Sequence, residues 1–203
     1  MTTLEEGSFL VKLARQAITK YVSESIQITP PEPLSPSLAL DCGVFVTLEK
    51  LKGSGKSLRG CIGYPLPCMP LINATIDAAI SAAVNDPRFS PVRKSELNDV
   101  VVEVSVMTPP KQLEISDPKE YPRHIKVGRD GLIIEKGYYK GLLLPQVPVE
   151  YGWDEETFLS ECCMKACLPP DSWVSKDVKV FTFTAEVFTE MRPGGEVERK
   201  SMS

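Results

Sequence analysis

The chain has 203 residues, of which 42% are hydrophobic and 25% charged, as in an ordinary globular protein. Its net charge of −4, without a block of basic residues, speaks against a general binder of nucleic-acid backbones, although a local basic cleft is compatible with it. The N-terminus lacks the pattern of a signal peptide, and no apolar run approaches the roughly 18–20 residues that span a bilayer. We therefore expect a cytoplasmic protein that makes no membrane contact.

The six cysteines are expected to be free thiols, because disulfides are rare in the cytoplasm. No C-x-x-C pair occurs, and His124 is the only histidine. A zinc site of the usual spacing is therefore not expected, and the sequence indicates neither a metal nor a cofactor.

The N-terminal segment predicts an amphipathic helix over about residues 4–23. Thr2 or Thr3, followed three residues later by Glu5 or Glu6, fits a capping box, and apolar residues then recur at helical spacing. The stretch TPPEPLSPSL (29–38) has four prolines, which favour an extended strap across the surface or a disordered linker over a helix.

A hairpin, a helix and a strand follow in that order. CGVFVTLEKL (42–51) and KSLRGCIGY (56–64) flank the flexible KGSG, a pattern typical of a hairpin. Residues 70–86 are rich in Ala, Ile and Leu and predict a helix that ends before Pro87. The β-branched run VVVEVSVM (100–107) predicts a strand.

The second half repeats this order. RHIKV and LIIEK flank the turn GRDG, Asp154 caps a helix, and VKVFTFTAEVF (178–188) predicts a closing strand. The repeat predicts an α+β fold of two similar hairpin–helix–strand units within one domain over residues 1–191. The last residues, 192–203, are expected to be a mobile tail.

The motif LRGCIG (58–63) is the main candidate for chemistry. Side chains alternate along a strand, so Arg59 and Cys61 are predicted to share the face opposite Leu58 and Ile62. A guanidinium about 6 Å from a thiol contributes roughly 0.7 kcal/mol in water and about 3 kcal/mol at an effective dielectric constant of 20. That would lower the thiol pKa by about half a unit to two units. Whether the thiol is ionised at neutral pH therefore depends on its exposure.

The glycines around Cys61 extend this hypothesis. Gly60 and Gly63 admit a close backbone approach, and the N–H groups that open the next helix, near Cys68–Pro70, could bind an anion beside the thiol. The alternative is a tight strand-to-helix turn that merely contains a cysteine.

Several motifs together resemble the AMMECR-domain family, named for a human chromosomal region linked to Alport syndrome, intellectual disability, midface hypoplasia and elliptocytosis. They are LRGCIG, DPRF (86–89), VEVSVM (102–107), LLLPQV (142–147) and YGWD (151–154), and the similarity covers about residues 5–190. The resemblance implies an α+β fold with a larger and a smaller subdomain around a cleft. It supplies no reaction, but it does suggest a basic cellular process that could involve nucleic acid.

The resemblance marks Arg59, Gly60, Cys61 and Gly63 in the hallmark motif, and it adds further candidates: Asp86, Arg88, Glu103 and Gln146. Each has a plainer interpretation. Glu103 is expected on a solvated face unless it pairs with Arg59 or Arg88, and Asp86 could simply brace the Pro87 turn. Arg88 suits a phosphate or a carboxylate but also an ordinary loop, and Gln146 is expected to line the cleft. His124 suits acid–base work by its chemistry alone and starts a predicted strand.

Two hypotheses result. In the first, the protein is an enzyme with Cys61 as nucleophile, Arg59 as its electrostatic partner and Glu103 or His124 as proton carrier. Its substrate would be a small polar or nucleobase-type molecule held in the cleft. In the second, the chain is a non-catalytic scaffold that binds protein or nucleic acid, and its acidic charge fits a protein partner better than duplex DNA.

Overall fold

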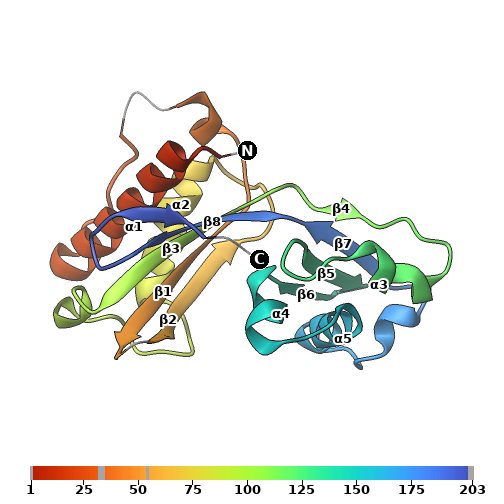
Figure 1. Cartoon of the computed structure of the whole chain (residues 1–203). Coiled ribbons are helices and arrows are strands. Elements are labelled where there is room, and N and C mark those ends of the chain that lie inside the picture. The colour runs from red at the N-terminus through yellow and green to blue at the C-terminus, as the bar shows by residue number, and fades with distance from the viewer. Residues whose placement is uncertain (1, 32–34, 54, 201–203) are drawn as a thin grey trace. The chain divides into compact units, whose positions relative to one another are not determined.

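The computed structural model describes residues 2–31, 35–53 and 55–200 and places them in two units, each built on its own sheet (Figure 1). The first unit contains the chain up to Met107 and again from Glu186, and the second contains Thr108–Ala185. The second unit is therefore an insertion in the sequence of the first.

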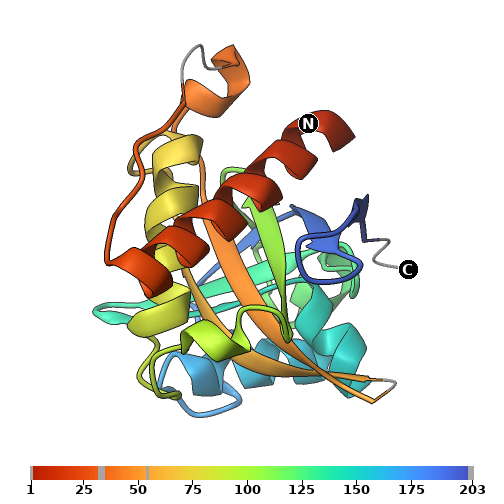
Figure 2. The same ribbon diagram turned by 90° about the vertical axis from the view of Figure 1, so that its left-hand side faces the viewer.

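The first unit combines a five-stranded sheet, in the order β2-β1-β3-β8-β9, with two long helices. Its elements are α1 (Leu4–Glu24), the short 3₁₀ turn η1 (Pro36–Ala39), β1 (Val44–Lys52), β2 (Gly55–Tyr64), α2 (Leu71–Val84), the 3₁₀ turn η2 (Lys94–Glu96), β3 (Val100–Met107), β8 (Ala185–Glu190) and β9 (Val197–Arg199). Helices α1 and α2 lie against each other on one face of this sheet (Figure 2).

Helix α1 begins as the sequence predicts. The Thr3 hydroxyl accepts from the Glu6 N–H while the Glu6 carboxylate accepts from the Thr3 N–H, so both halves of the capping box are formed. The Glu6 carboxylate also accepts from Ser35 and Ser37, which ties the proline-rich strap to the start of this helix. Residues 32–34 of that strap lie outside the described part of the chain.

The hydrophobic core of the first unit lies between the helices and the sheet. Alternate residues of β1 and β3 point into it, including Val46, Leu48, Val102 and Val104. The face occupied by Glu103 is therefore the opposite one, as the alternation predicts.

A largely buried ion pair connects α1 to β8, to β3 and to the residue that follows η2. The Arg15 guanidinium binds the Glu190 carboxylate and donates to the carbonyls of Leu97 and Val100, at 3.0 and 2.6 Å. Glu190 also accepts from the Val102 N–H at 3.0 Å. Every group is satisfied, which is the condition under which a buried ion pair is tolerated.

The second unit has a four-stranded sheet in the order β4-β7-β5-β6, whose strands pair antiparallel. Its elements are β4 (Lys111–Gln112), the 3₁₀ turn η3 (Pro118–Glu120), α3 (Tyr121–His124), β5 (Gly131–Lys136), β6 (Tyr139–Leu143), α4 (Gln146–Tyr151), α5 (Glu155–Lys165), the 3₁₀ turn η4 (Ser172–Val174) and β7 (Lys179–Phe183). Asp154 caps α5 by accepting from the Thr157 N–H, and α5 buries Phe158, Leu159 and Cys162 in a second core.

The two units share the order of hairpin, helix and strand, but the hairpin of the second unit is β5–β6, and RHIKV (123–127), expected to pair with LIIEK, forms no strand. In each, the strand after the helix pairs antiparallel with the first strand of the hairpin, giving β2-β1-β3 and β6-β5-β7. The α+β class is thereby confirmed.

Three local expectations are wrong. Residues 178–188 form two strands, β7 and β8, in different sheets, and His124 ends the short helix α3 instead of starting a strand. The expected tail forms β9, which pairs with β8 through Phe188 and Arg199, so backbone hydrogen bonds fix the segment through Lys200. Residues 201–203 lie outside the described part. Among the described residues, no helix is long and apolar enough to cross a membrane.

Candidate active site

Cys61 lies in a row of polar side chains that crosses the sheet of the first unit. Its partner in β1 is Thr47, and the partner of Thr47 in β3 is Glu103. All three share the face that points away from the helices, and the Thr47 hydroxyl lies 3.3 Å from the Cys61 sulfur. The row continues to Lys200, whose ammonium binds the Glu103 carboxylate at 2.9 Å.

Arg59 does not share the face of Cys61, contrary to the prediction. The pairing of β1 with β2 slips at this point: Leu48 pairs with Gly60 and Glu49 with Leu58, so Arg59 is the extra residue of a β-bulge. The added residue reverses the alternation, which is why Leu58 is exposed and not in the core.

The Arg59 guanidinium turns to η2 instead. It binds both carboxylate oxygens of Glu96, at 3.0 and 3.1 Å, and lies over the Phe89 ring. Arg59 therefore holds η2 against β2. The prediction that Arg59 is the electrostatic partner of Cys61 is wrong.

The cation next to Cys61 is Arg88. Its guanidinium donates to the Cys61 carbonyl at 3.3 Å and to both oxygens of Asp86, at 3.0 and 2.7 Å. The Asp86 carboxylate in turn accepts from the Cys61 N–H at 2.8 Å. Because β2 is an edge strand, Asp86 and Arg88 satisfy the backbone groups of Cys61 that would otherwise face an open edge. The DPRF and LRGCIG motifs are thus two halves of one arrangement.

The C-terminal end of α2, and not its N-terminal end, lies beside the motif. Gly60 packs under Ala82, since a Cβ on Gly60 would lie 2.1 Å from the Ala82 carbonyl oxygen. At the other end of β2, the Tyr64 hydroxyl binds Asp77, which is nearer the start of α2. The proposed anion site at the opening of α2 is therefore not beside the thiol, and the Leu71 N–H there donates to the Leu40 carbonyl.

Gly60 and Gly63 are required by packing. A Cβ on Gly63 would lie 2.3 Å from the Val44 carbonyl oxygen and 2.5 Å from the Phe45 ring. Both glycines permit the close approach that the sequence predicts, but what approaches them is the protein's own backbone and ring atoms.

The Cys61 thiol is half-buried and protonated at rest. Burial raises its pKa, and this outweighs the hydrogen bond from Thr47 and the charge of Arg88, which both favour the thiolate. Asp86 and Glu103 add negative charge and act in the same direction as burial. Chemistry at this sulfur therefore needs a group that removes its proton.

Glu103 is buried, although a solvated face was expected. Its exposed fraction is 3%, and its partner is Lys200, not Arg59 or Arg88. Burial raises the pKa of Glu103 more than the neighbouring Lys200 lowers it. Asp86 differs, because its bonds to Arg88 lower its pKa to about 2. Of the two carboxylates, Glu103 is the stronger base.

Comparison with known proteins assigns the chain to a family. The profile of the AMMECR1 family matches residues 11–188. The chain belongs to this family. AMMECR1-type relatives include a protein of Thermococcus onnurineus, 60% identical over 98% of this chain and 97% of its own length. A Methanocaldococcus jannaschii relative is 52% identical over 100% of this chain and 98% of its own length.

A solved structure supports the fold of this AMMECR1 family member. The crystal structure of an uncharacterized protein from Pyrococcus horikoshii matches with a TM-score of 0.93 and 57% identity, and the match covers 97% of each chain.

Two predicted site residues of this AMMECR1 protein lie in the second unit. His124 is exposed at the end of α3. Gln146 begins α4, and its side-chain oxygen is buried without a hydrogen-bond partner among the described residues. Such an orphan acceptor is uncommon, and Gln146 keeps its predicted binding role as a hypothesis. Across residues 2–31, 35–53 and 55–200, no group of three or more His, Cys, Asp or Glu residues is placed to hold a metal ion.

Sequence reasoning missed Thr47 and Lys200. The alternation of β1 shows Thr47 as the polar residue between Val46 and Leu48, but only the strand register places it between Cys61 and Glu103. Nothing in the sequence connects Lys200 to Glu103, since the β8–β9 hairpin brings them together.

Proposed function

We propose that the protein is an enzyme that uses the Cys61 thiol as a nucleophile on a small polar substrate, with nucleobase-type molecules included in that class. The observation that supports this most is the row of Cys61, Thr47, Glu103 and Lys200 across one sheet face. It places a nucleophile, a hydroxyl, a carboxylate and an ammonium in sequence, and an ordinary structural cysteine needs none of these.

The proposed step is addition of the thiol to an electrophilic carbon that is double-bonded to a heteroatom or to another carbon. The sulfur–carbon bond forms as the π bond breaks, and the electron pair moves to the far atom. The thiol proton passes to Glu103 through the Thr47 hydroxyl, which lies on the strand between them, and is then delivered to that far atom, so the step needs no oxidant or reductant. Lys200 pairs with the Glu103 carboxylate and favours its charged form, and the Thr47 hydroxyl donates to the developing thiolate.

Glu103 is assigned as the proton acceptor in preference to Asp86. A carboxylate with a pKa of about 2 is a weak base, and Asp86 is held by Arg88 and the Cys61 N–H. The raised pKa of Glu103 brings it closer to the pKa of the thiol, which favours transfer.

The test compares the alkylation rates of individual cysteines by peptide mass spectrometry after timed exposure to iodoacetamide. Cys42 is a matched control within the chain, because it is also half-buried, burial also raises its pKa, and its thiol donates to the Met107 carbonyl. We expect Cys61 to react faster than Cys42 at neutral pH. We also expect Glu103→Gln to slow the alkylation of Cys61 by about tenfold. A well-positioned base contributes more than this in favourable cases.

The alkylation rates of Cys42 and of the exposed Cys68 should be unchanged in Glu103→Gln. Unchanged rates would show that the fold is intact. If Cys61 reacts no faster than Cys42 and is insensitive to Glu103→Gln, the nucleophile proposal fails. The protonated thiol would then favour the alternative, a non-catalytic domain that binds protein or nucleic acid.

A further inference from the structure

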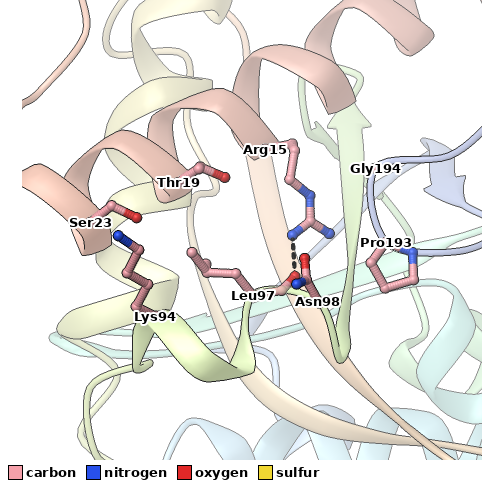
Figure 3. A pocket seen from close by; sticks show the side chains of 8 residues that line it. All are labelled: Arg15, Thr19, Ser23, Lys94, Leu97, Asn98, Pro193 and Gly194. Carbon is pink, nitrogen blue, oxygen red and sulfur yellow. Dashed lines mark hydrogen bonds between the residues drawn. The ribbon is translucent and has the colours of Figure 1, made fainter.

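A polar hollow lies in the first unit, separate from the row at Cys61. It has a volume of about 280 Å³, and its lining comes from α1, from the segment around η2 and from the turn between β8 and β9 (Figure 3). Arg15, Thr19 and Ser23 are spaced by four residues along α1, so they form one stripe on the helix. Lys94 and Asn98 lie across from this stripe, and Pro193 closes one end.

The side chains that line the hollow offer hydrogen-bond donors and no carboxylate. Thr19 and Ser23 contribute hydroxyl groups, and Asn98 contributes an amide. In Figure 3 the Lys94 ammonium points toward the Ser23 hydroxyl. The Lys94 ammonium has no hydrogen-bond or ion-pair partner among the residues that the structure describes, so its charge is available to a ligand.

Arg15 lines the hollow, but its guanidinium is not free to bind a ligand. Its three nitrogens are engaged by Glu190 and by the carbonyls of Leu97 and Val100. The charge of Arg15 is therefore balanced, and the net charge that the hollow offers comes from Lys94. The same bonds fix α1 against the segment that carries Leu97 and Asn98, so the backbone on both sides of the hollow is held in place before any ligand arrives.

We propose that this hollow binds the phosphate group of a small molecule. A carboxylate is best recognised by the planar fork of an arginine, and the only guanidinium in the lining is fully engaged. A phosphate accepts many hydrogen bonds and is suited to a lysine point charge surrounded by hydroxyl and amide donors. The volume exceeds that of the phosphate group, which leaves room for the body of a phosphomonoester.

The test is an NMR titration of the full chain, with the amide signals of Thr19, Ser23 and Asn98 as reporters. Inorganic phosphate, glycerol phosphate and acetate are each added at constant ionic strength. We expect saturable shifts with both phosphates and none that saturate with acetate. Tighter binding of glycerol phosphate would assign a phosphomonoester, and equal binding would assign free phosphate.

Lys94→Gln should weaken phosphate binding by at least about fivefold, because it removes the one uncompensated charge. Ser23→Ala should weaken it less. The matched control is Lys165→Gln, which removes an exposed lysine from α5 in the second unit and should leave binding unchanged. The proposal would be overturned if both lysine variants weakened phosphate binding equally, if acetate gave saturable shifts, or if chloride reproduced the shifts.

Discussion

Cys61 illustrates how a charge close to a thiol can fail to ionise it. Arg88 lies next to the residue, but its guanidinium is shared between the Cys61 carbonyl and the Asp86 carboxylate. The negative charge of Asp86 opposes the effect of Arg88 on the sulfur, and burial then dominates. The ion pair consequently acts on the backbone of Cys61, and the activation proposed for its thiol comes from the side of β1, where Thr47 and then Glu103 lie.

Asp86 provides a prediction about stability and pH. Its pKa is about 2 in the folded protein, against about 3.9 for an unperturbed aspartate. A lowered pKa means that the carboxylate stabilises the fold above pH 4, and that this contribution is lost as the pH falls from about 4 toward 2. Asp86→Asn should therefore lower the free energy of unfolding by about 2 kcal/mol at pH 7 and by much less near pH 2.

Urea unfolding at both pH values measures this difference. Glu96, whose pKa is also lowered to about 2 by Arg59, titrates in both proteins and cancels in the comparison. Asp99→Asn is the control, since Asp99 is an exposed carboxylate in the same unit and should cost little at either pH. A loss for Asp86→Asn that is the same at both pH values would show that the charge of Asp86 is not what stabilises the motif.

At the residue scale, the sequence singles out LRGCIG and DPRF as candidate motifs but does not reveal their contacts. LRGCIG and DPRF do meet, yet the partner of Asp86 is the backbone N–H of Cys61, which carries no sequence signal. The bulge at Arg59 inserts one residue into the alternation, and a strict two-residue period therefore assigns Arg59 to the wrong face. Buried Glu103 is paired with Lys200, almost one hundred residues away, which no local pattern can reveal.

At the scale of elements, local chemistry defined most boundaries. The capping box sets the start of α1, Asp154 sets the start of α5, and the β-branched run coincides with β3. The wrongly predicted elements lie where tertiary contacts determine the secondary structure. Residues 178–188 look like one strand, but hydrogen bonds divide them between two sheets at Thr184.

The packing of α2 on β2 leads to a second stability prediction. Gly60→Ala would place a Cβ 2.1 Å from the Ala82 carbonyl oxygen, and a backbone atom cannot move aside as the end of a side chain can. We expect the substitution to lower the free energy of unfolding by more than about 2 kcal/mol, at the upper end of the cost of overpacking. Thermal and urea unfolding would measure it.

Gly53→Ala is the matched control in the same hairpin. A Cβ there meets nothing within 4 Å, but the residue has a φ of +54°, so only backbone strain of roughly 1 kcal/mol is expected. If Gly60→Ala costs no more than Gly53→Ala, then α2 has room to move away from β2, and close packing does not explain the first glycine of the motif.

The molecule as a whole is one unit interrupted by another. The first unit depends on β8 and β9, which return after the insertion and supply Glu190 to Arg15 and Lys200 to Glu103. The second unit has a core of its own, formed by α5 and its sheet, with Phe158 and Leu159 fully buried. Its two ends are joined, because the Thr108 N–H donates to the Thr184 carbonyl at 2.8 Å and the Thr184 N–H to the Thr108 hydroxyl at 2.9 Å.

This arrangement predicts that the fragment Thr108–Ala185 folds alone. A separate core and closed ends are what a domain needs to be independent, although a chain of this size buries a smaller share of its surface than a larger domain does. We expect a cooperative urea transition and dispersed amide NMR signals from the fragment. Thr184→Pro, which removes the N–H that bonds to Thr108, should shift the transition to lower urea while leaving it cooperative. A fragment without a cooperative transition would mean that its core is stable only when the first unit is present, and the hairpin–helix–strand repeat would then be a similarity of topology without independence of folding.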